Sequence, residues 1–456
     1  MQSIDPATTE CIGTFESHDE QAVETRLARA SERFETWRDR PITERQAMLA
    51  GVADVLEANE AEYARTMTAE MGKPITQARS EVRKCARVCE YYAENAAVFL
   101  QDERVGVEPD ADTYVTYEPL GPVLAVMPWN YPFWQVFRFA APALAAGNVC
   151  LLKHAPNVQG CAEAIADAFE RAGFPASALQ VLRVADEAVA DIIADDRVRA
   201  VTLTGSVGAG RAVAREAGAQ LKKTVLELGG SDPFIVLDDA DIESAAAVGC
   251  QSRTYNTGQS CIAAKRFIVH EAVYDAFLDR LAAEMDALVV GDPTDDATDV
   301  GPMARADLLT DLHEQVEQSV AAGATVERGG EPLDREGHFY PPTILTDVPA
   351  DAPAACEELF GPVAAVLAVE SAEDALELAN DTEYGLGATV WTDDRERGEE
   401  LARRIDAGGV FVNEFVTSHL ELPFGGIKNS GYGRELAGEG IREFVNRKSV
   451  WVSDPS

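Results

Sequence analysis

The strongest constraint on the fold is a regular alternation of short apolar runs and amphipathic stretches between residues 148 and 230. Branched apolar residues fill the short runs, which have the length of buried strands. The longer stretches carry apolar residues at three- and four-residue spacing, which indicates helices. The strand-like runs are "NVCLLKH", "LQVLRV", "VRAVTLTG" and "KTVLELGG". Strands that alternate with helices pair in parallel, so we predict an α/β fold with a doubly wound, nucleotide-binding domain.

Further regions flank this pattern. Residues 20–100 have helical periodicity, and residues 113–117 alternate like an exposed strand before the apolar run at 123–127. From about residue 229 a second α/β region begins, with the strand-like runs "PFIVL", "KRFIVH", "AAVLAV", "GATVWT" and "GGVFVN". Near the end, "KSVWVS" is an apolar strand that would need a pairing partner, such as another subunit.

The chain is strongly acidic, with a formal net charge of −39. Such a surface repels nucleic acids and anionic membranes, so neither is an expected partner. Two interpretations of the acidity stay open: general solubility, or adaptation of a halophilic protein to a salt-rich cytosol that screens its self-repulsion. No run of eighteen apolar residues occurs, and no basic segment followed by an apolar one begins the sequence. We therefore expect a cytoplasmic protein.

Eight cysteines are spread along the chain, at positions 11, 85, 89, 150, 161, 250, 261 and 356. They form no C-x-x-C pair, and no histidines cluster with them at zinc spacing, so we expect neither a metal site nor a disulfide framework. Cys261 lies among small and polar residues in "NTGQSCIAAK". Because a free thiol has a pKa of about 8.5, a nucleophilic cysteine needs backbone amides, a helix N-terminus or a nearby cation. Helix-compatible residues and two cations follow Cys261; buried packing is the alternative.

Two other segments could supply polar groups to such a cysteine. In "MPWNYPFWQVFR", prolines flank Asn130, whose amide could hold an oxyanion. If the following segment is helical, Trp134 and Arg138 share one face, although an aromatic core helix with a snorkelling arginine would give the same pattern. Glu227 lies in an apolar run just before two glycines, where a carboxylate is either paired structurally or held as a base with a raised pKa.

A glycine-rich turn, "LTGSVGAG", follows one of the predicted strands of the alternating region. Its glycines, Gly205, Gly208 and Gly210, would let backbone amides at a helix N-terminus approach a pyrophosphate. The usual G-x-G-x-x-G fingerprint is absent from the first strand–helix turn, and a plain tight turn explains these glycines equally well.

Five motifs now occur together in one order: "PWNYP", "LELGG", "GQSC", "EELFGPV" and "PFGGIKNSGYGRE". The same order is found in aldehyde dehydrogenases, and the motifs extend over nearly the whole chain. The sequence resembles the NAD(P)-dependent aldehyde dehydrogenase superfamily, and most closely its short succinate-semialdehyde dehydrogenases. The resemblance implies two Rossmann-like α/β domains and a small β oligomerisation element. The implied NAD(P)-binding domain covers 1–108 and 124–228, the catalytic domain 229–420, and the oligomerisation or bridging strands 109–123 and 436–456.

The resemblance also implies a mechanism. Cys261 would attack the aldehyde carbon to form a thiohemiacetal, whose oxyanion would be held by the Asn130 side chain and the Cys261 backbone N–H. Loss of hydride to the nicotinamide would leave a thioester, and Glu227 would activate the water that hydrolyses it to a carboxylic acid. Family branches that transfer the acyl group to coenzyme A tend to lack this glutamate, so Glu227 favours hydrolysis.

The resemblance assigns the cofactor, NAD or NADP, to a set of residues by region. Those near the adenosine half are Trp129 and Lys153, those near the pyrophosphate are Gly205, Ser206 and Gly210, and those near the nicotinamide riboside are Glu358 and Phe360. The chain departs from many NAD-preferring relatives at Pro156, where they carry a ribose-binding glutamate. Proline neither accepts a hydrogen bond from a 2′-hydroxyl nor repels a 2′-phosphate, so the preference between the two cofactors stays open.

The resemblance suggests a small aldehyde with a carboxylate at its far end, most simply succinate semialdehyde. Arg138 could pair with that carboxylate, and relatives that act on succinate semialdehyde also use a serine that matches Ser418. Trp134 and Phe424 would line the apolar middle of the tunnel. The alternatives are lactaldehyde, a simple aliphatic aldehyde, or a non-catalytic protein on the same fold. We expect a homodimer or a homotetramer.

Overall fold

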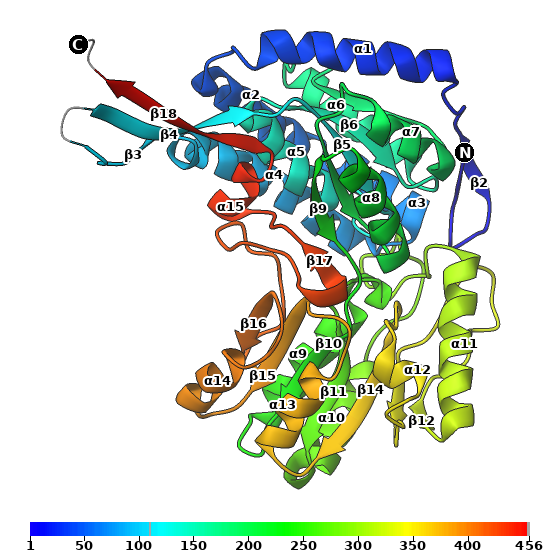
Figure 1. Ribbon diagram of the computed structural model, residues 1–456. Helices are drawn as coiled ribbons and strands as arrows, with labels where there is room; N and C mark the ends of the chain where they lie inside the picture. Colours follow the sequence, from blue (N-terminus) through cyan, green and yellow to red (C-terminus); the bar gives the residue numbers. More distant parts are fainter. Residues whose placement is uncertain (109–110, 454–456) are drawn as a thin grey trace.

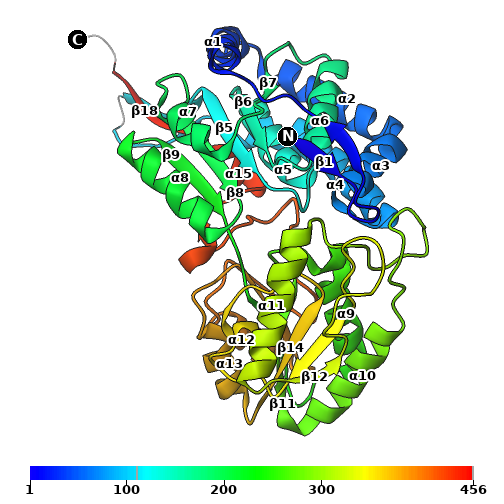
Figure 2. The ribbon, with the colours of Figure 1, turned by 90° about the vertical axis from the view of Figure 1, so that its right-hand side faces the viewer.

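A computed structural model describes residues 1–108 and 111–453 of the chain. Its two largest sheets belong to two α/β units that lie one above the other in Figure 1, each with helices packed against its sheet. A side view shows the N-terminal hairpin next to the upper unit (Figure 2). The predicted fold, with Rossmann-like parallel sheets, is confirmed. No helix in the described ranges is long and apolar enough to cross a membrane.

The first sheet has six strands in the order β17-β9-β8-β5-β6-β7. Five of them are parallel, as the alternating sequence pattern predicts: β5 (Pro122–Met127), β6 (Val149–His154), β7 (Leu179–Val181), β8 (Ala200–Thr204) and β9 (Lys223–Glu227). The sixth, β17 (Gly431–Tyr432), arrives from the far end of the chain and pairs antiparallel with β9, with Gly431 opposite Glu227. This long-range pairing had no sequence signal, and it brings one of the late glycine motifs next to Glu227.

The helices of this unit follow the predicted periodicity. Their bounds are α1 (Glu20–Trp37), α2 (Ile42–Ala58), α3 (Glu60–Met71), α4 (Ile75–Phe99), α5 (Trp134–Ala146), α6 (Gln159–Arg171), η1 (Asp186–Ala188), α7 (Val189–Ala194), α8 (Val207–Ala219) and α15 (Ala437–Arg442). Every residue of α5 is buried, because it lies between the sheet and α4. Cys85 and Cys89 are buried in α4 as packing residues.

The second sheet has seven strands in the order β12-β13-β14-β11-β10-β15-β16. Their bounds are β10 (Asp232–Val236), β11 (Ala264–His270), β12 (Thr325–Arg328), β13 (Thr343–Thr346), β14 (Val363–Val369), β15 (Gly387–Trp391) and β16 (Gly409–Val412). The surrounding helices are α9 (Ile242–Thr254), η2 (Tyr255–Gly258), η3 (Glu271–Val273), α10 (Tyr274–Asp286), α11 (Ala306–Ala322), α12 (Pro353–Cys356), α13 (Ala372–Asn380) and α14 (Arg395–Ala402). The five apolar runs predicted after residue 229 all form strands of this sheet.

Smaller elements complete the chain. The C-terminal strand β18 (Val445–Ser453) pairs along its whole length with β4 (Ala111–Pro119), which also pairs with β3 (Glu103–Arg104). The partner that "KSVWVS" needs is therefore first supplied by its own chain. Residues 109–110 and 454–456, the ends of the expected bridging segments, lie outside the described ranges. A hairpin of β1 (Gln2–Ile4) and β2 (Cys11–Thr14) and the short turn η4 (Lys428–Ser430) were not predicted.

A buried glutamate of α4, Glu81, attaches that helix to the start of α5. Lys73 pairs with Glu81, and both side chains are almost fully buried. The other Glu81 oxygen accepts hydrogen bonds from the backbone N–H groups of Phe133 and Trp134, each at 2.9 Å. A carboxylate at a helix N-terminus satisfies free amides and complements the helix dipole. Glu81 therefore sets where α5 begins, and with it the direction of Trp134.

Replacing Glu81 by alanine should lower the free energy of unfolding by about 3–5 kcal/mol, because Lys73 is left buried without its partner. Urea unfolding followed by circular dichroism measures the change. The double variant Lys73→Met/Glu81→Gln removes both charges together and should lose less stability than Glu81→Ala. A loss below about 1 kcal/mol in Glu81→Ala would contradict the role given to this pair.

Candidate active site

The segment before Cys261 is a left-handed turn between α9 and β11. Asn256, Thr257 and Gly258 have φ angles of 56°, 56° and 70°. Such angles suit glycine and are tolerated by asparagine, but they strain a β-branched threonine. A Cβ on Gly258 would lie 2.4 Å from the carbonyl carbon of Gly361, so the site admits only glycine. Backbone strain of this kind persists only where the surroundings hold it firmly.

Hydrogen bonds from buried polar side chains keep the turn in this strained conformation. Arg253, which is completely buried, donates to the Gly258 carbonyl at 2.5 Å. The Asn256 amide donates to the Asn130 carbonyl at 2.8 Å. Gln259 accepts from the Ala304 N–H at 2.9 Å. Each bond joins the turn to a different part of the chain, so the turn cannot relax alone.

Cys261 lies at the exit of this turn, half-buried, on the wall of a cavity of about 560 Å³. Burial raises the pKa of its thiol to about 12, while the nearby Lys265 charge acts to lower it. Its backbone N–H donates to no other group in the described ranges. The residues after Cys261 form a turn and then β11, so the helix-compatible pattern there was misleading.

Asn130 lies beside the nucleophile segment, although 131 positions separate it from Cys261 in the sequence. Its Nδ2 donates to the Gln259 carbonyl at 3.0 Å, and its Oδ1 accepts from Gln135 at 3.1 Å. The second amide hydrogen is left for another acceptor. The amide is therefore held in one orientation close to Cys261.

Glu227 ends β9 as a buried carboxyl with both oxygens unpaired in the described ranges. Burial raises its pKa well above the ordinary value, and the negative charge of Glu435 adds to the effect, while Arg138 opposes it. Gly425 leaves the room that this carboxyl needs, because a Cβ there would lie 2.6 Å from Oε1 of Glu227. A buried, unpaired carboxyl with a raised pKa fits a general base better than a structural ion-pair member.

Arg138 lines the cavity, as expected from its sequence position, but its guanidinium is already paired within the protein. Its Nε pairs with Glu435, and both side chains are 4% exposed. Its guanidinium also lies over the Phe424 ring, 4.5 Å from the ring centroid. Glu435 was missed because no local pattern in "GRELAG" distinguishes a buried glutamate from a surface one.

A second cation in the same cavity was also missed. Lys84 of α4 donates to the Ser418 hydroxyl at 2.7 Å, and its ammonium lies 4.3 Å from the Trp134 ring centroid. Burial, together with the nearby Arg138 charge, lowers the pKa of Lys84 to about 8. The sequence contained one indication of this role. Lys84 lies three residues after Glu81 on the same helix, and this spacing places both side chains on the face toward α5.

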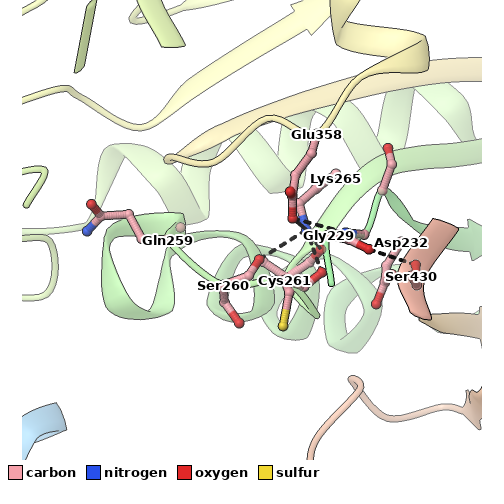
Figure 3. Close-up of polar contacts among 12 residues, drawn as sticks. Gly229, Asp232, Gln259, Ser260, Cys261, Lys265, Glu358 and Ser430 are labelled. Atoms are coloured by element: carbon pink, nitrogen blue, oxygen red, sulfur yellow. Dashed lines mark hydrogen bonds and ion pairs between the residues drawn. The ribbon is translucent and has the colours of Figure 1, made fainter. Parts of the chain in front are cut away.

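Figure 3 shows a cluster behind the nucleophile, built around the Lys265 ammonium. Lys265 is completely buried and donates to carbonyl groups of the Cys261 segment. Glu358 and Asp232 lie near it, and burial raises the pKa of Asp232 to about 7. In this view the Cys261 sulfur points away from the cluster.

The residues expected around the cofactor fit a dinucleotide. Ser206 caps the N-terminus of α8, and the N–H groups of Val207 and Gly208 donate to no acceptor in the described part of the chain. Free amides at a helix N-terminus bind phosphate. Trp129 and Phe360 meet edge to face at 5.7 Å, and Lys153 pairs with Asp186. Gly210 also has a packing role, because its missing side chain lets α8 approach Leu228; a Cβ there would lie 2.6 Å from the Leu228 side chain.

Comparison with known proteins agrees with this geometry. Residues 1–450 match the aldehyde dehydrogenase family. A probable succinate-semialdehyde dehydrogenase [NADP(+)] of Synechocystis is 52% identical over 99% of this chain and 100% of the relative. A succinate-semialdehyde dehydrogenase [NADP(+)] of Mycolicibacterium paratuberculosis is 51% identical over 99% of this chain and 96% of the relative.

Solved structures share the fold of this chain. The crystal structure of succinic semialdehyde dehydrogenase from Streptococcus pyogenes with NADP+ has a TM-score of 0.97 and 40% identity, covering 99% of this chain and 100% of that one. The structure of Gox0499 also has a TM-score of 0.97, with 43% identity and 98% of each chain covered. With a family match over nearly its whole length and a fold shared with these enzymes, the chain belongs to the aldehyde dehydrogenase family.

Proposed function

We propose that this aldehyde dehydrogenase oxidises succinate semialdehyde to succinate with NADP as the electron acceptor. One cavity supports the substrate assignment most directly, because Cys261 and two cations, Lys84 and Arg138, line it together with Ser418. Charge-assisted hydrogen bonds from such groups suit the carboxylate at the far end of the substrate. The relatives that are about 50% identical carry the name of this activity.

The residues of the chain divide the reaction between them. The Cys261 thiolate attacks the aldehyde carbon, and the Asn130 amide with the Cys261 N–H stabilises the resulting oxyanion. A bound NADP would supply the hydride acceptor for this carbon. Glu227 then takes a proton from water, whose oxygen attacks the thioester carbon, and the C–S bond breaks to release succinate and the thiol.

The preference for NADP rests on the names of the relatives rather than on one residue. Pro156 is exposed and offers no carboxylate to the 2′-position of the adenosine ribose, so nothing there repels a 2′-phosphate. Lys153 is the cation on the neighbouring strand that would face it, and the free amides of α8 with Ser206 would hold the pyrophosphate. Glu358 and Phe360 would contact the nicotinamide riboside.

We infer that the two large sheets divide the chain as the sequence analysis expects, with 1–108 and 124–228 binding the cofactor and 229–420 carrying the nucleophile. The outer edge of β18 would meet another copy in a homodimer or homotetramer, since Trp451 and Val452 are 51% and 53% exposed on that strand. We also infer that the protein lies in the cytoplasm, because all eight cysteines are free thiols and a reducing compartment keeps thiols in that form.

A neutral aldehyde such as lactaldehyde or an aliphatic one is the second candidate, and the Arg138–Glu435 pair favours it, because Glu435 cancels the arginine charge. Lys84 argues for the carboxylate instead. Its nearest acceptor is a neutral hydroxyl, so its charge is not cancelled by hydrogen bonding.

Lys84→Met should raise KM for succinate semialdehyde about 10- to 100-fold, since a hydrogen bond between charged groups contributes about 1.5–3 kcal/mol. Arg138→Ala should also raise this KM, by less than Lys84→Met, because Glu435 already pairs with the arginine. Both variants should change KM for pentanal, a neutral aldehyde of similar length, by less than about 3-fold. Steady-state kinetics with the two aldehydes measures the contrast, and Lys84→Arg is the control that keeps the charge. Equal effects on both aldehydes would exclude a carboxylate site here.

Glu227→Gln should lower kcat about 100- to 10,000-fold, because the thioester loses its base. Stopped-flow absorbance should show a burst of NADPH near one per active site, followed by slow turnover. In the wild-type enzyme kcat should rise with pH, because the raised pKa of Glu227 means that its ionised form appears only at higher pH. Unchanged turnover, or a linear time course without a burst, would contradict this role.

A further inference from the structure

The Lys265 ammonium has an unusual set of partners. Its Nζ donates to the carbonyls of Ser260, Cys261 and Ala263 at 3.0, 2.7 and 3.3 Å. All three acceptors belong to one short segment that contains the nucleophile (Figure 3). The three hydrogens of the ammonium are thereby used on neutral carbonyls rather than on a carboxylate.

Charged neighbours lie one step further away. Oε1 of Glu358 is 3.9 Å from Nζ, and it accepts from the Gly230 N–H at 3.0 Å. Burial lowers the pKa of Lys265, whereas Glu358 and Asp232 act to keep the ammonium charged, and Arg253 opposes them. A buried lysine without such carboxylates would lose its proton.

We propose that Lys265 is a positioning residue of the reaction, whose ammonium fixes the peptide planes around Cys261 and joins them to Glu358. This inference rests on the proposed function only in that Cys261 is the nucleophile.

The geometry of the peptide bond gives Lys265 control of the oxyanion site. The Ser260 carbonyl and the Cys261 N–H belong to the same trans peptide plane, so they point in opposite directions. Holding the carbonyl on Lys265 therefore aims the N–H away from the cluster. That N–H has no acceptor in the described ranges, and it is one of the two proposed oxyanion donors.

The charge of Lys265 also acts on the nucleophile. Among the charged groups that influence the Cys261 thiol, Lys265 and Arg138 favour the thiolate, and Glu358 and Asp232 oppose it. Lys265 has the larger effect of the two cations. Because the thiolate is the reactive form, loss of this charge should slow every reaction of the sulfur.

Alkylation of Cys261 by iodoacetamide, without aldehyde or cofactor and followed at this residue by peptide mass spectrometry, measures this effect, since Cys11 and Cys356 are also exposed thiols. Lys265→Met should slow alkylation at pH 8 about 10-fold, which corresponds to about one unit in the thiol pKa. It should also lower kcat about 100-fold, as expected when an oxyanion donor is misdirected. Lys265→Arg keeps the charge and should retain most of the alkylation rate. Lys448→Met removes a surface lysine of β18 and should change neither rate.

A purely structural lysine would give a different result: Lys265→Met would lower the melting temperature, while the alkylation rate and its pH dependence would match the wild type. That result would overturn the proposal. If Lys265→Met does not fold, Lys265→Gln provides the same comparison with a neutral side chain. Because alkylation needs no aldehyde, its outcome is separate from that of the succinate-semialdehyde assignment, which wild-type turnover tests.

Discussion

The strained turn at residues 256–258, held from behind by buried cations, is the constraint on which the site depends. Left-handed backbone at asparagine and threonine costs about 1–3 kcal/mol per strained residue and survives only if the surroundings oppose relaxation. Arg253 binds the turn itself, and Lys265 binds the segment that follows it. With these carbonyls directed toward the cations, the Cys261 sulfur points away from the Lys265 cluster, and Cys261 lines the cavity. The Asn130 amide, which binds the same segment, completes the arrangement.

Helices α4 and α5 form another part of the cavity wall. Glu81 determines where α5 begins, and α4 itself contributes Lys84. The cavity thus contains positive groups inside a protein with a net charge of −39. At low ionic strength the whole molecule repels an anionic aldehyde and NADP at long range, and salt screens this repulsion beyond about 10 Å at 0.1 M. Contacts inside the cavity are buried and are screened much less.

Local patterns predicted the elements but not their long-range contacts. The alternation at 148–230 gave the parallel strands of the first sheet, because a strand or helix is specified by residues close in sequence. Cys261, Asn130 and Glu227 were candidates from their local sequence, each with a packing or structural alternative, and only the order of the motifs joined them into one site. Lys84, Glu435 and the part played by Lys265 were missed, since each acts through a partner distant in sequence or through backbone carbonyls that leave no residue pattern. The strand pairing of Gly431 with Glu227 was missed for the same reason, because the two residues are distant in sequence.

The carboxylate site is tested by the specificity constant, kcat/KM, of the wild-type enzyme for succinate semialdehyde against pentanal, measured with NADP and with NAD at low and high potassium chloride. If Lys84 and Arg138 bind a substrate carboxylate, NADPH should form at least about 10-fold more efficiently with the carboxylated aldehyde, the scale of one charge-assisted hydrogen bond, and added salt should not abolish the preference. Equal or greater efficiency with pentanal would contradict a site organised around a carboxylate.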